Sequence, residues 1–431
     1  MEWRRKYSLR SYLRSSLWVV PVVAYIVSFI AVRAIGYLDE WLHWEWVWKL
    51  ELTTVQSALQ GLISSTVSFI VFAFSSLLVA IQVASAQLTP RIIATTLLRD
   101  NTLRAVVALF VLTLSFGLGT LARSQKEVQY LLLTVSVFLA GSSTVAFIYL
   151  IDYAARLLRP VSIVWRLGED GLKVIEQVYP LKIREPHVPS APSAPLPPPD
   201  RTIFHSGVSG IVLAVDLEAL RREAERTDGM IEFAHHVGNF VPVGEPLFNL
   251  HGSAVNADDG SLCAAVAFGR ERTIEQDATF SFRVIVDIAI KALSRAINDP
   301  TTAVLALDQL HRLLRAVGRR HLHDDVITDD RGRVRVVFRT PDWQDFVELS
   351  CREIRLYGAD NYQVARRMRA MLENLAQTLP ATRAPALLRE LSLLDRTLER
   401  LDMLADDLSL AHTADLQGLG APLRAPRARG I

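Results

Sequence analysis

Ala58-Leu-Gln-Gly-Leu-Ile-Ser-Ser-Thr-Val-Ser-Phe-Ile-Val-Phe-Ala-Phe-Ser-Ser-Leu-Leu-Val-Ala-Ile-Gln-Val-Ala84 is the stretch of this chain that decides its fold. It contains no ionisable side chain, and the uncharged run around it extends from Glu51 to Arg91. Roughly 20 mainly apolar residues in a helix cross a hydrocarbon core about 30 Å thick. The stretch is therefore predicted to be a membrane-spanning helix.

Three further stretches have the same character, at Leu17 to Leu38, Leu103 to Leu121 and Tyr130 to Ile151. Together the four predict an all-α transmembrane bundle within residues 1–160. No Asp, Glu, Lys or His lies in the middle of any of them. Because proton- and ion-coupled transporters commonly need such a group inside the membrane, the sequence disfavours a pump or symporter.

Lysine and arginine indicate how the spans are oriented, since cytoplasmic loops are enriched in both. Most of the cations would lie on one side of the membrane if all four stretches cross it. They occur before the first span, between spans two and three and after span four: Arg4, Arg5, Lys6, Arg10, Arg14, Arg91, Arg99, Arg104, Arg156, Arg159 and Arg166. We therefore expect a multi-pass protein of the cell (plasma or inner) membrane with both termini cytoplasmic.

Small and polar residues of the second span recur every seven residues, at Gly61, Ser68, Ser75 and Gln82. A seven-residue repeat keeps one face of a helix turned towards a constant neighbour or axis. One interpretation is close packing of helices through small residues. The other is a pore or solute path lined by hydroxyl and amide groups. The sequence leaves both open.

A spacer and a small β-domain are predicted after the fourth span. Residues 161–200 read as an amphipathic helical segment followed by a proline-rich linker, which marks a domain boundary. Residues 201–268 have short β-type runs, and Val237-Gly-Asn-Phe-Val-Pro-Val-Gly-Glu-Pro-Leu247 resembles the turn of biotinyl and lipoyl domains. That resemblance implies a small barrel or sandwich. No lysine occurs between Lys182 and Lys291, so no biotin or lipoate is expected, nor any other cofactor.

Residues 269–380 are predicted to form a helical cytoplasmic domain with a short β-hairpin at Val326 to Arg339. One helix is expected to begin through capping by Thr273 and to reach Ala296. Asp299 is predicted to cap the next helix, with Pro300 in its first turn.

Four polar residues before this hairpin superficially resemble a metal site: His321, His323, Asp324 and Asp325. Because no further ligand flanks them, they are weak candidates, and a solvated loop without metal is expected.

The C-terminal region, residues 381–412, is predicted to be one leucine-rich helix with an apolar seam over three heptads: Leu387, Leu391, Leu394, Leu398, Leu401, Ala405 and Leu408. Such a seam is typical of a coiled coil between chains, but also of an amphipathic helix that packs on its own domain. Residues 413–431 are expected to be a mobile tail.

The overall composition excludes several classes of function. A formal net charge of +2 disfavours a nucleic acid partner. The two cysteines, Cys263 and Cys351, provide neither a disulfide framework nor a zinc motif. No Ser-His-Asp, metal or phosphate-loop pattern is present, so the sequence does not predict an enzyme.

Several blocks, in order along the chain, resemble a family of bacterial predicted membrane proteins that is numbered 2254 among domains of unknown function. The blocks are Phe72-Ala-Phe-Ser-Ser-Leu-Leu-Val-Ala-Ile-Gln-Val-Ala-Ser-Ala-Gln-Leu-Thr-Pro-Arg91, Val237 to Gly244, Gly269-Arg-Glu-Arg-Thr-Ile-Glu-Gln-Asp277, Val286-Asp-Ile-Ala-Ile-Lys-Ala-Leu-Ser-Arg-Ala-Ile-Asn-Asp-Pro300 and Ile354-Arg-Leu-Tyr-Gly-Ala-Asp360. The resemblance covers Leu17 to Thr378, with Arg295 standing where the family pattern has proline. It implies a membrane location and this architecture, and no activity.

We expect the protein to lie in the lipid bilayer as a homo-oligomer, and two functions are considered for it. The first is an ion or small-solute channel lined by the second span. The alternative is a non-conducting, membrane-tethered regulator or scaffold whose cytoplasmic region binds a small molecule or a protein of unknown identity.

Overall fold

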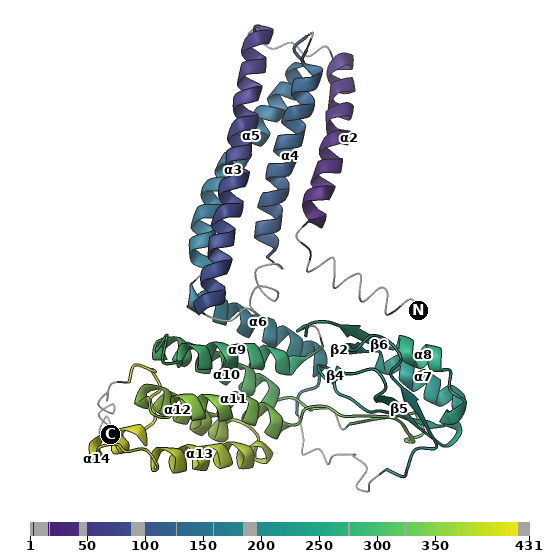
Figure 1. Cartoon of the computed structure of the whole chain (residues 1–431), viewed down its shortest axis with the longest axis vertical. Coiled ribbons are helices and arrows are strands. Elements are labelled where there is room, and N and C mark those ends of the chain that lie inside the picture. The colour runs from purple at the N-terminus through teal and green to yellow at the C-terminus, as the bar shows by residue number, and fades with distance from the viewer. Residues whose placement is uncertain are drawn as a thin grey trace, which may run out of the picture. The chain divides into compact units, whose positions relative to one another are not determined.

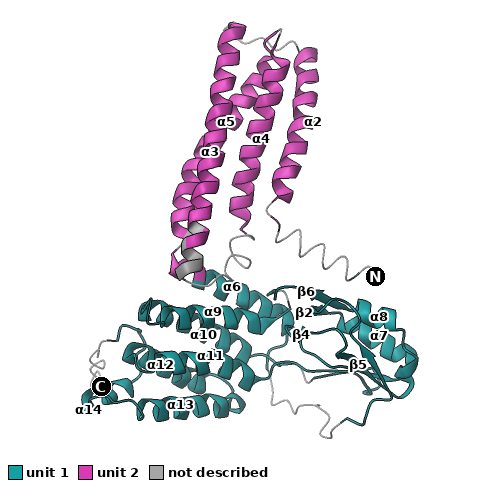
Figure 2. Ribbon diagram, viewed as in Figure 1, with its two compact units in different colours: residues 1–10, 87–89, 164–431 teal, residues 11–86, 90–163 magenta. Residues whose placement is uncertain are grey.

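The computed structural model describes residues 3, 16, 18–42, 50–87, 100–125, 127–157, 159–183, 196–274, 276–322 and 325–420. Its helices and the strands β2, β4, β5 and β6 are labelled in Figure 1. The chain divides into two compact units (Figure 2), a bundle of residues 11–86 and 90–163 and a second unit of residues 1–10, 87–89 and 164–431.

The bundle contains the four apolar helices that the sequence predicts. They are α2 (Val19–Leu42), α3 (Leu52–Gln87), α4 (Asn101–Arg123) and α5 (Tyr130–Leu157). All four are long and apolar enough to cross a membrane. With 36 residues and a rise of about 1.5 Å per residue, α3 is longer than the roughly 30 Å hydrocarbon core requires.

Close packing of α2 against α4 depends on glycine. A Cβ atom added at Gly119 would lie 2.9 Å from a methyl group of Val32, so only glycine allows this approach. Between α4 and α5, the Thr113 and Ser143 hydroxyls form a buried hydrogen bond of 2.7 Å. Apolar contacts and this polar pair together fix how these three helices pack.

Helix α6 (Pro160–Val178) runs from the last residues of the bundle unit into the second unit and is amphipathic, as predicted for residues 161–178. Its inner face buries Ile163, Leu167 and Ile175. Most of the predicted proline-rich linker, residues 184–195, lies outside the described residues.

Two small sheets form the β region of the second unit. The first has the order β1 (Arg201–Phe204), β5 (Pro246–His251), β3 (Met230–Phe233), β8 (Val334–Phe338) and β7 (Val326–Thr328), and only β3 and β8 are parallel neighbours. The second is antiparallel, with β2 (Gly210–Val215) between β4 (Phe240–Val241) and β6 (Val266–Gly269). Helices α7 (Leu217–Thr227) and α8 (Asp259–Ala264) accompany them, and Ile231, Phe248 and Val336 lie in the shared core.

This arrangement corrects two predictions. The described strands form open sheets, so they do not make the closed barrel that the Val237–Leu247 turn suggested. The hairpin β7–β8 is also part of the β region and not of the helical domain, because Ile231 of β3 pairs with Val336 of β8. Parallel pairing between strands about a hundred residues apart leaves no local sequence signal.

The helical part comprises α9 (Ala278–Ala292), α10 (Pro300–Gly318), α11 (Trp343–Gly358), α12 (Tyr362–Thr378), α13 (Ala384–Leu398) and α14 (Ala405–Ala411). The predicted cap Thr273 is wrong: α9 is capped by Asp277, whose Oδ1 accepts from the Phe280 N–H at 3.1 Å. The helix also ends before Ala296, and Asn298 then adopts a positive φ of 50°.

The C-terminal region differs from its prediction in two ways. The leucine-rich segment is not one helix, because it is interrupted between α13 and α14. Leu387, Leu394 and Leu398 are fully buried within their own chain, so the first half of the apolar seam packs on its own helices, whereas Leu401 and Leu408 are half-buried and Ala405 is exposed. Residues 413–420 are not a free tail, since Arg366 donates to the carbonyls of Thr413 and Gly420. Residues 421–431 lie outside the described residues.

Candidate functional site

The sequence-predicted line of small and polar residues runs along one face of α3. Gly61, Ser68, Ser75 and Gln82 are all exposed in the single chain. The side of α3 that packs on its own bundle carries Leu59, Thr66 and Ala73, each two residues before a member of the line. Two residues turn an α-helix through about 200°, so the polar line faces directly away from the helices of its own chain.

The hydroxyl groups on this face are partly satisfied within the helix. The Ser68 hydroxyl donates to the Ser64 carbonyl at 2.9 Å, and the Ser65 hydroxyl donates to the Gly61 carbonyl at the same distance. Back-bonding of this kind lets serine remain in a helix that faces an apolar surrounding. The amide of Gln82 has more donors and acceptors than a helix backbone can satisfy.

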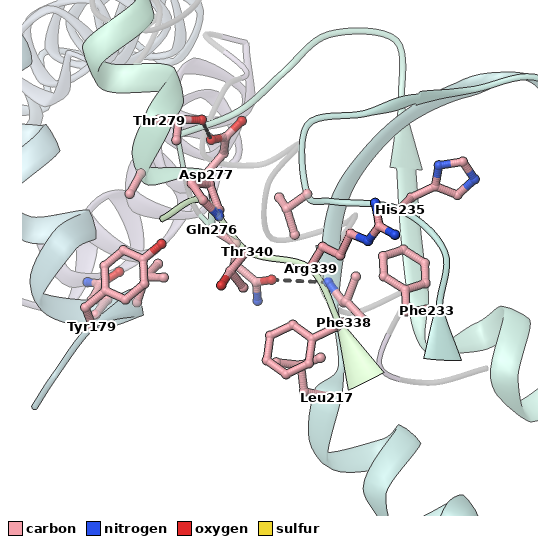
Figure 3. Close-up of a pocket in the computed structure, with 16 residues that line it drawn as sticks. Tyr179, Leu217, Phe233, His235, Gln276, Asp277, Thr279, Phe338, Arg339 and Thr340 are labelled. Atoms are coloured by element: carbon pink, nitrogen blue, oxygen red, sulfur yellow. Dashed lines mark hydrogen bonds between the residues drawn. The ribbon is translucent and has the colours of Figure 1, made fainter. Parts of the chain in front are cut away.

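A cavity of about 370 Å³ lies inside the second unit (Figure 3). It is lined by the end of α6, the ends of β2, β3 and β8, and the first turn of α9, and it is partly open to solvent. Phe233 and Phe338 form part of its apolar wall, and Arg339 is exposed beside them. Volumes of this order accommodate small molecules, which are usually held by an apolar lining with a few polar groups.

The polar groups of the cavity wall are held by hydrogen bonds. Gln276 accepts from the Val215 N–H at 3.2 Å, and His235 Nε2 donates to the Pro246 carbonyl at 2.8 Å. Burial raises the pKa of Tyr179, and the nearby carboxylates of Asp277 and Asp325 act in the same direction.

Asp277 is the most constrained of these residues, with only 6% of its surface exposed. Its Oδ1 accepts from the Thr279 hydroxyl at 2.5 Å, while Oδ2 is buried without a hydrogen-bond partner among the described residues. Burial raises the pKa of this carboxyl, against the lowering effect of Arg272. Glycine is required beside it, because a Cβ at Gly238 (φ 93°) would lie 2.6 Å from Oδ2.

The weak metal candidates do not form a cluster in the part of the chain that the structure describes, where no three His, Cys, Asp or Glu side chains lie together. Asp325 Oδ1 accepts from the Thr340 N–H and hydroxyl, at 2.8 and 2.7 Å. The backbone N–H of His321 donates to the Leu181 carbonyl. His323 and Asp324 lie outside the described residues.

Asp299 and Pro300 occupy the first turn of α10. Asp299 Oδ1 accepts from the Thr302 N–H at 3.1 Å and Oδ2 from its hydroxyl at 2.5 Å. Pro300 stands at the start of the helix, where a backbone N–H would have no partner in any case. The role of both residues is structural.

Sequence reasoning did not find the cavity, because its walls come from five separate segments and none of them carries a recognisable binding motif. The sequence pointed to the cavity only indirectly, through one block of the family resemblance. The block Gly269–Asp277, one of those that carry the family resemblance, ends at the buried carboxylate in the cavity wall.

Four apolar helices of spanning length followed by a large α+β unit define a class of predicted membrane proteins with a substantial soluble region. Within that class, this chain belongs to the family described as predicted membrane protein DUF2254, which matches residues 14–374.

The chain is similar to the uncharacterized proteins Rv1290c of Mycobacterium tuberculosis and Mb1321c of Mycobacterium bovis. It is 26% identical to each over 427 residues, which cover 92% of this chain and 78% of the relative. No solved structure matches the chain.

Proposed function

We propose that this protein is a homo-oligomeric membrane channel for ions or small solutes, with α3 of each copy lining the path. The observation that carries the proposal is the direction of the polar line on α3. Ser68 and Ser75 are exposed on the side opposite the buried residues Thr66 and Ala73. Residues that serve packing within one chain would face the other way.

The energetics of this face favour contact with other copies. Small residues allow helices to approach closely in a bilayer, and polar side chains there form hydrogen bonds across helices. The Gln82 amide would lose its hydrogen bonds wherever it met hydrocarbon, which costs several kcal/mol per unsatisfied group. An assembly around α3 would instead give this face polar neighbours and water.

We also propose that all four helices cross the membrane and that both termini are cytoplasmic. The support is the distribution of lysine and arginine, most of which would then lie on one side. The absence of Asp, Glu, Lys and His from the middle of the four helices supports passive flux over ion-coupled transport.

Flux through the reconstituted protein tests the proposal. Purified protein in liposomes is expected to release ions or small solutes, under some combination of voltage, tension or added ligand. Ser75→Phe should reduce that release strongly, because a bulky apolar side chain would fill the path. Ile30→Phe, at an exposed apolar position of α2, is the matched control. Absence of flux under all conditions contradicts the proposal.

A second candidate is a non-conducting regulator with a ligand-binding soluble region, and the cavity in the second unit favours it. This function predicts a saturable small-molecule ligand in a protein that shows no flux. Ligands that raise the melting temperature of the wild-type protein should lose their effect in Val237→Trp, which fills the cavity. Ligands that stabilise the wild-type protein and the Val237→Trp variant equally would contradict a role for this cavity.

A further inference from the structure

The exposed face of helix α6 is apolar in its first turns and charged in its later turns. Val161 and Trp165 project from its first turns, and each is 52% exposed. Further along the same face lie Glu169, Lys173 and Glu176, all of them charged. The spacing of four, four, four and three residues places these five side chains on one stripe of the helix.

The opposite face of α6 packs against other helices of the second unit. Leu167 and Ile175 are buried there, and glycine allows close contact with two neighbouring helices. A Cβ at Gly171 would lie 3.0 Å from side-chain atoms of both Leu313 on α10 and Ser281 on α9. The exposed stripe therefore faces away from α9 and α10.

Charged members of the stripe already have partners within the unit. Glu169 pairs with Arg312 at 2.5 Å, Lys173 with Asp170 at 3.1 Å, and Glu176 with Arg320 at 3.1 Å. Within the described residues, the Arg312 guanidinium lies 4.2 Å from the centre of the Trp165 ring, and both Val161 and Trp165 remain half exposed. The first turns of α6 thus present apolar surface that the described residues leave uncovered.

Chain connectivity indicates what covers that surface. Helix α5, a candidate membrane span, ends at Leu157, and α6 begins at Pro160. Three residues span at most about 11 Å, so the start of α6 must remain close to the end of α5. Tryptophan is enriched at the level of the lipid headgroups, where its ring is apolar and its N–H meets water. Arg159, exposed beside Pro160, supplies a cation for lipid phosphates.

We propose that the first turns of α6 lie in the lipid headgroup layer, with Val161 and Trp165 as the apolar contact and Arg159 facing the phosphates. The charged half of the stripe then lies in water. The inference rests on α5 crossing the membrane, which is part of the proposed function, and does not depend on flux.

Lipid-borne quenchers test it in the full-length protein. Three variants, Val161→Cys, Lys173→Cys and Val145→Cys, are labelled with an environment-sensitive fluorophore, each in a Cys263→Ala background. The remaining native thiol, Cys351, is fully buried and is not expected to react. The proteins are placed in phosphatidylethanolamine–phosphatidylglycerol nanodiscs that carry nitroxide lipids. Lys173 is the matched control on the same stripe, and Val145, exposed within α5, reports whether that helix spans.

Nitroxide on the headgroup is expected to quench the label at position 161 several-fold more strongly than the label at position 173. Trp165→Ala should weaken the quenching at 161. Nitroxide on the acyl chain should quench the label at 145. Quenching at 145 with none at 161 overturns the headgroup contact alone. No quenching at 145 overturns the membrane placement of α5 and, with it, this inference.

Discussion

Ala73 and Ser75 lie two residues apart on α3 and face opposite ways: Ala73 is 7% exposed in a cluster with Phe110, whereas Ser75 is exposed. The same relation holds for Thr66 and Ser68 one repeat earlier. One face of α3 therefore belongs to its own bundle, and the other remains for lipid, water or a second copy. The proposed channel assigns that second face to other copies.

Cysteine cross-linking tests whether α3 meets α3. With Ser75→Cys in a Cys263→Ala background, oxidation in native membranes should produce covalent dimers, because equivalent positions would lie close together around a symmetry axis. Ile30→Cys, which is exposed on α2, should remain monomeric under the same conditions. Gel electrophoresis without reductant measures both. Equal dimer yields at the two positions would mean that the contact is random collision.

Gly119→Leu is expected to destabilise the bundle, because the new side chain would overlap Val32 of α2. Overpacking of this kind typically costs about 1–3 kcal/mol. Gly141→Leu is the control, since nothing lies within 4 Å of a Cβ added at Gly141. Thermal unfolding of the detergent-solubilised proteins measures the difference. A Gly119 variant as stable as the Gly141 variant would show that α2 and α4 are not closely packed.

Asp277→Asn should change how stability depends on pH. The pKa of Asp277 is raised by burial above its ordinary value of 3.8, so the folded chain holds a proton that the unfolded chain has already lost. Stability contributed at this position therefore falls as pH rises from 3.8 through the folded-state pKa. Asparagine removes that fall and still caps α9.

Melting curves from below pH 3.8 to neutrality test this expectation. The variant should gain stability relative to wild type as pH rises. Asp299→Asn makes the same change at the cap of α10 and controls for any effect on capping itself. Parallel pH profiles of the Asp277 variant and wild type would contradict a buried, proton-holding carboxyl.

Arg366→Ala should release the segment 413–420. Arg366 is 3% exposed and donates to the Thr413 and Gly420 carbonyls at 2.9 and 2.7 Å, while Asp415 accepts from the Gly418 and Gly420 N–H groups. Without the guanidinium, the amides of Gly418 and Gly420 should exchange hydrogen much faster. Hydrogen-exchange mass spectrometry compares this variant with Arg396→Ala, which alters an exposed arginine of α13. Unchanged exchange would mean that the segment is held by other contacts.

Local patterns in the sequence were sufficient for the apolar helices and for the start of α10, but not for the ends of α9 or the break between α13 and α14. The uncharged runs predicted α2 to α5, and Asp299-Pro300 predicted the start of α10. Predictions that depended on distant partners were incomplete. The parallel pairing of Ile231 with Val336 joins strands separated by several helices, and a heptad of leucines reads the same whether it packs on its own chain or on another.

For the candidate sites too, only features carried by one local segment could be predicted from the sequence. The seven-residue line on α3 was visible because one helix carries all of it, although its direction required the packed bundle. The cavity was not visible, since Tyr179, Phe233 and Phe338 come together only through the tertiary fold. The cap of α9 was misplaced at Thr273 because Thr273 and Asp277 both have suitable side chains, and burial of Phe280 and its neighbours decides between them.

A single-particle reconstruction of the protein in nanodiscs would show directly whether α3 lines a path through the membrane. A channel lined by α3 predicts a symmetric assembly in which α3 of every copy faces the axis, with Ser68 and Ser75 beside an axial opening. A particle that contains one chain, or an assembly in which the Gly61–Gln82 face of α3 is covered by lipid, would contradict it.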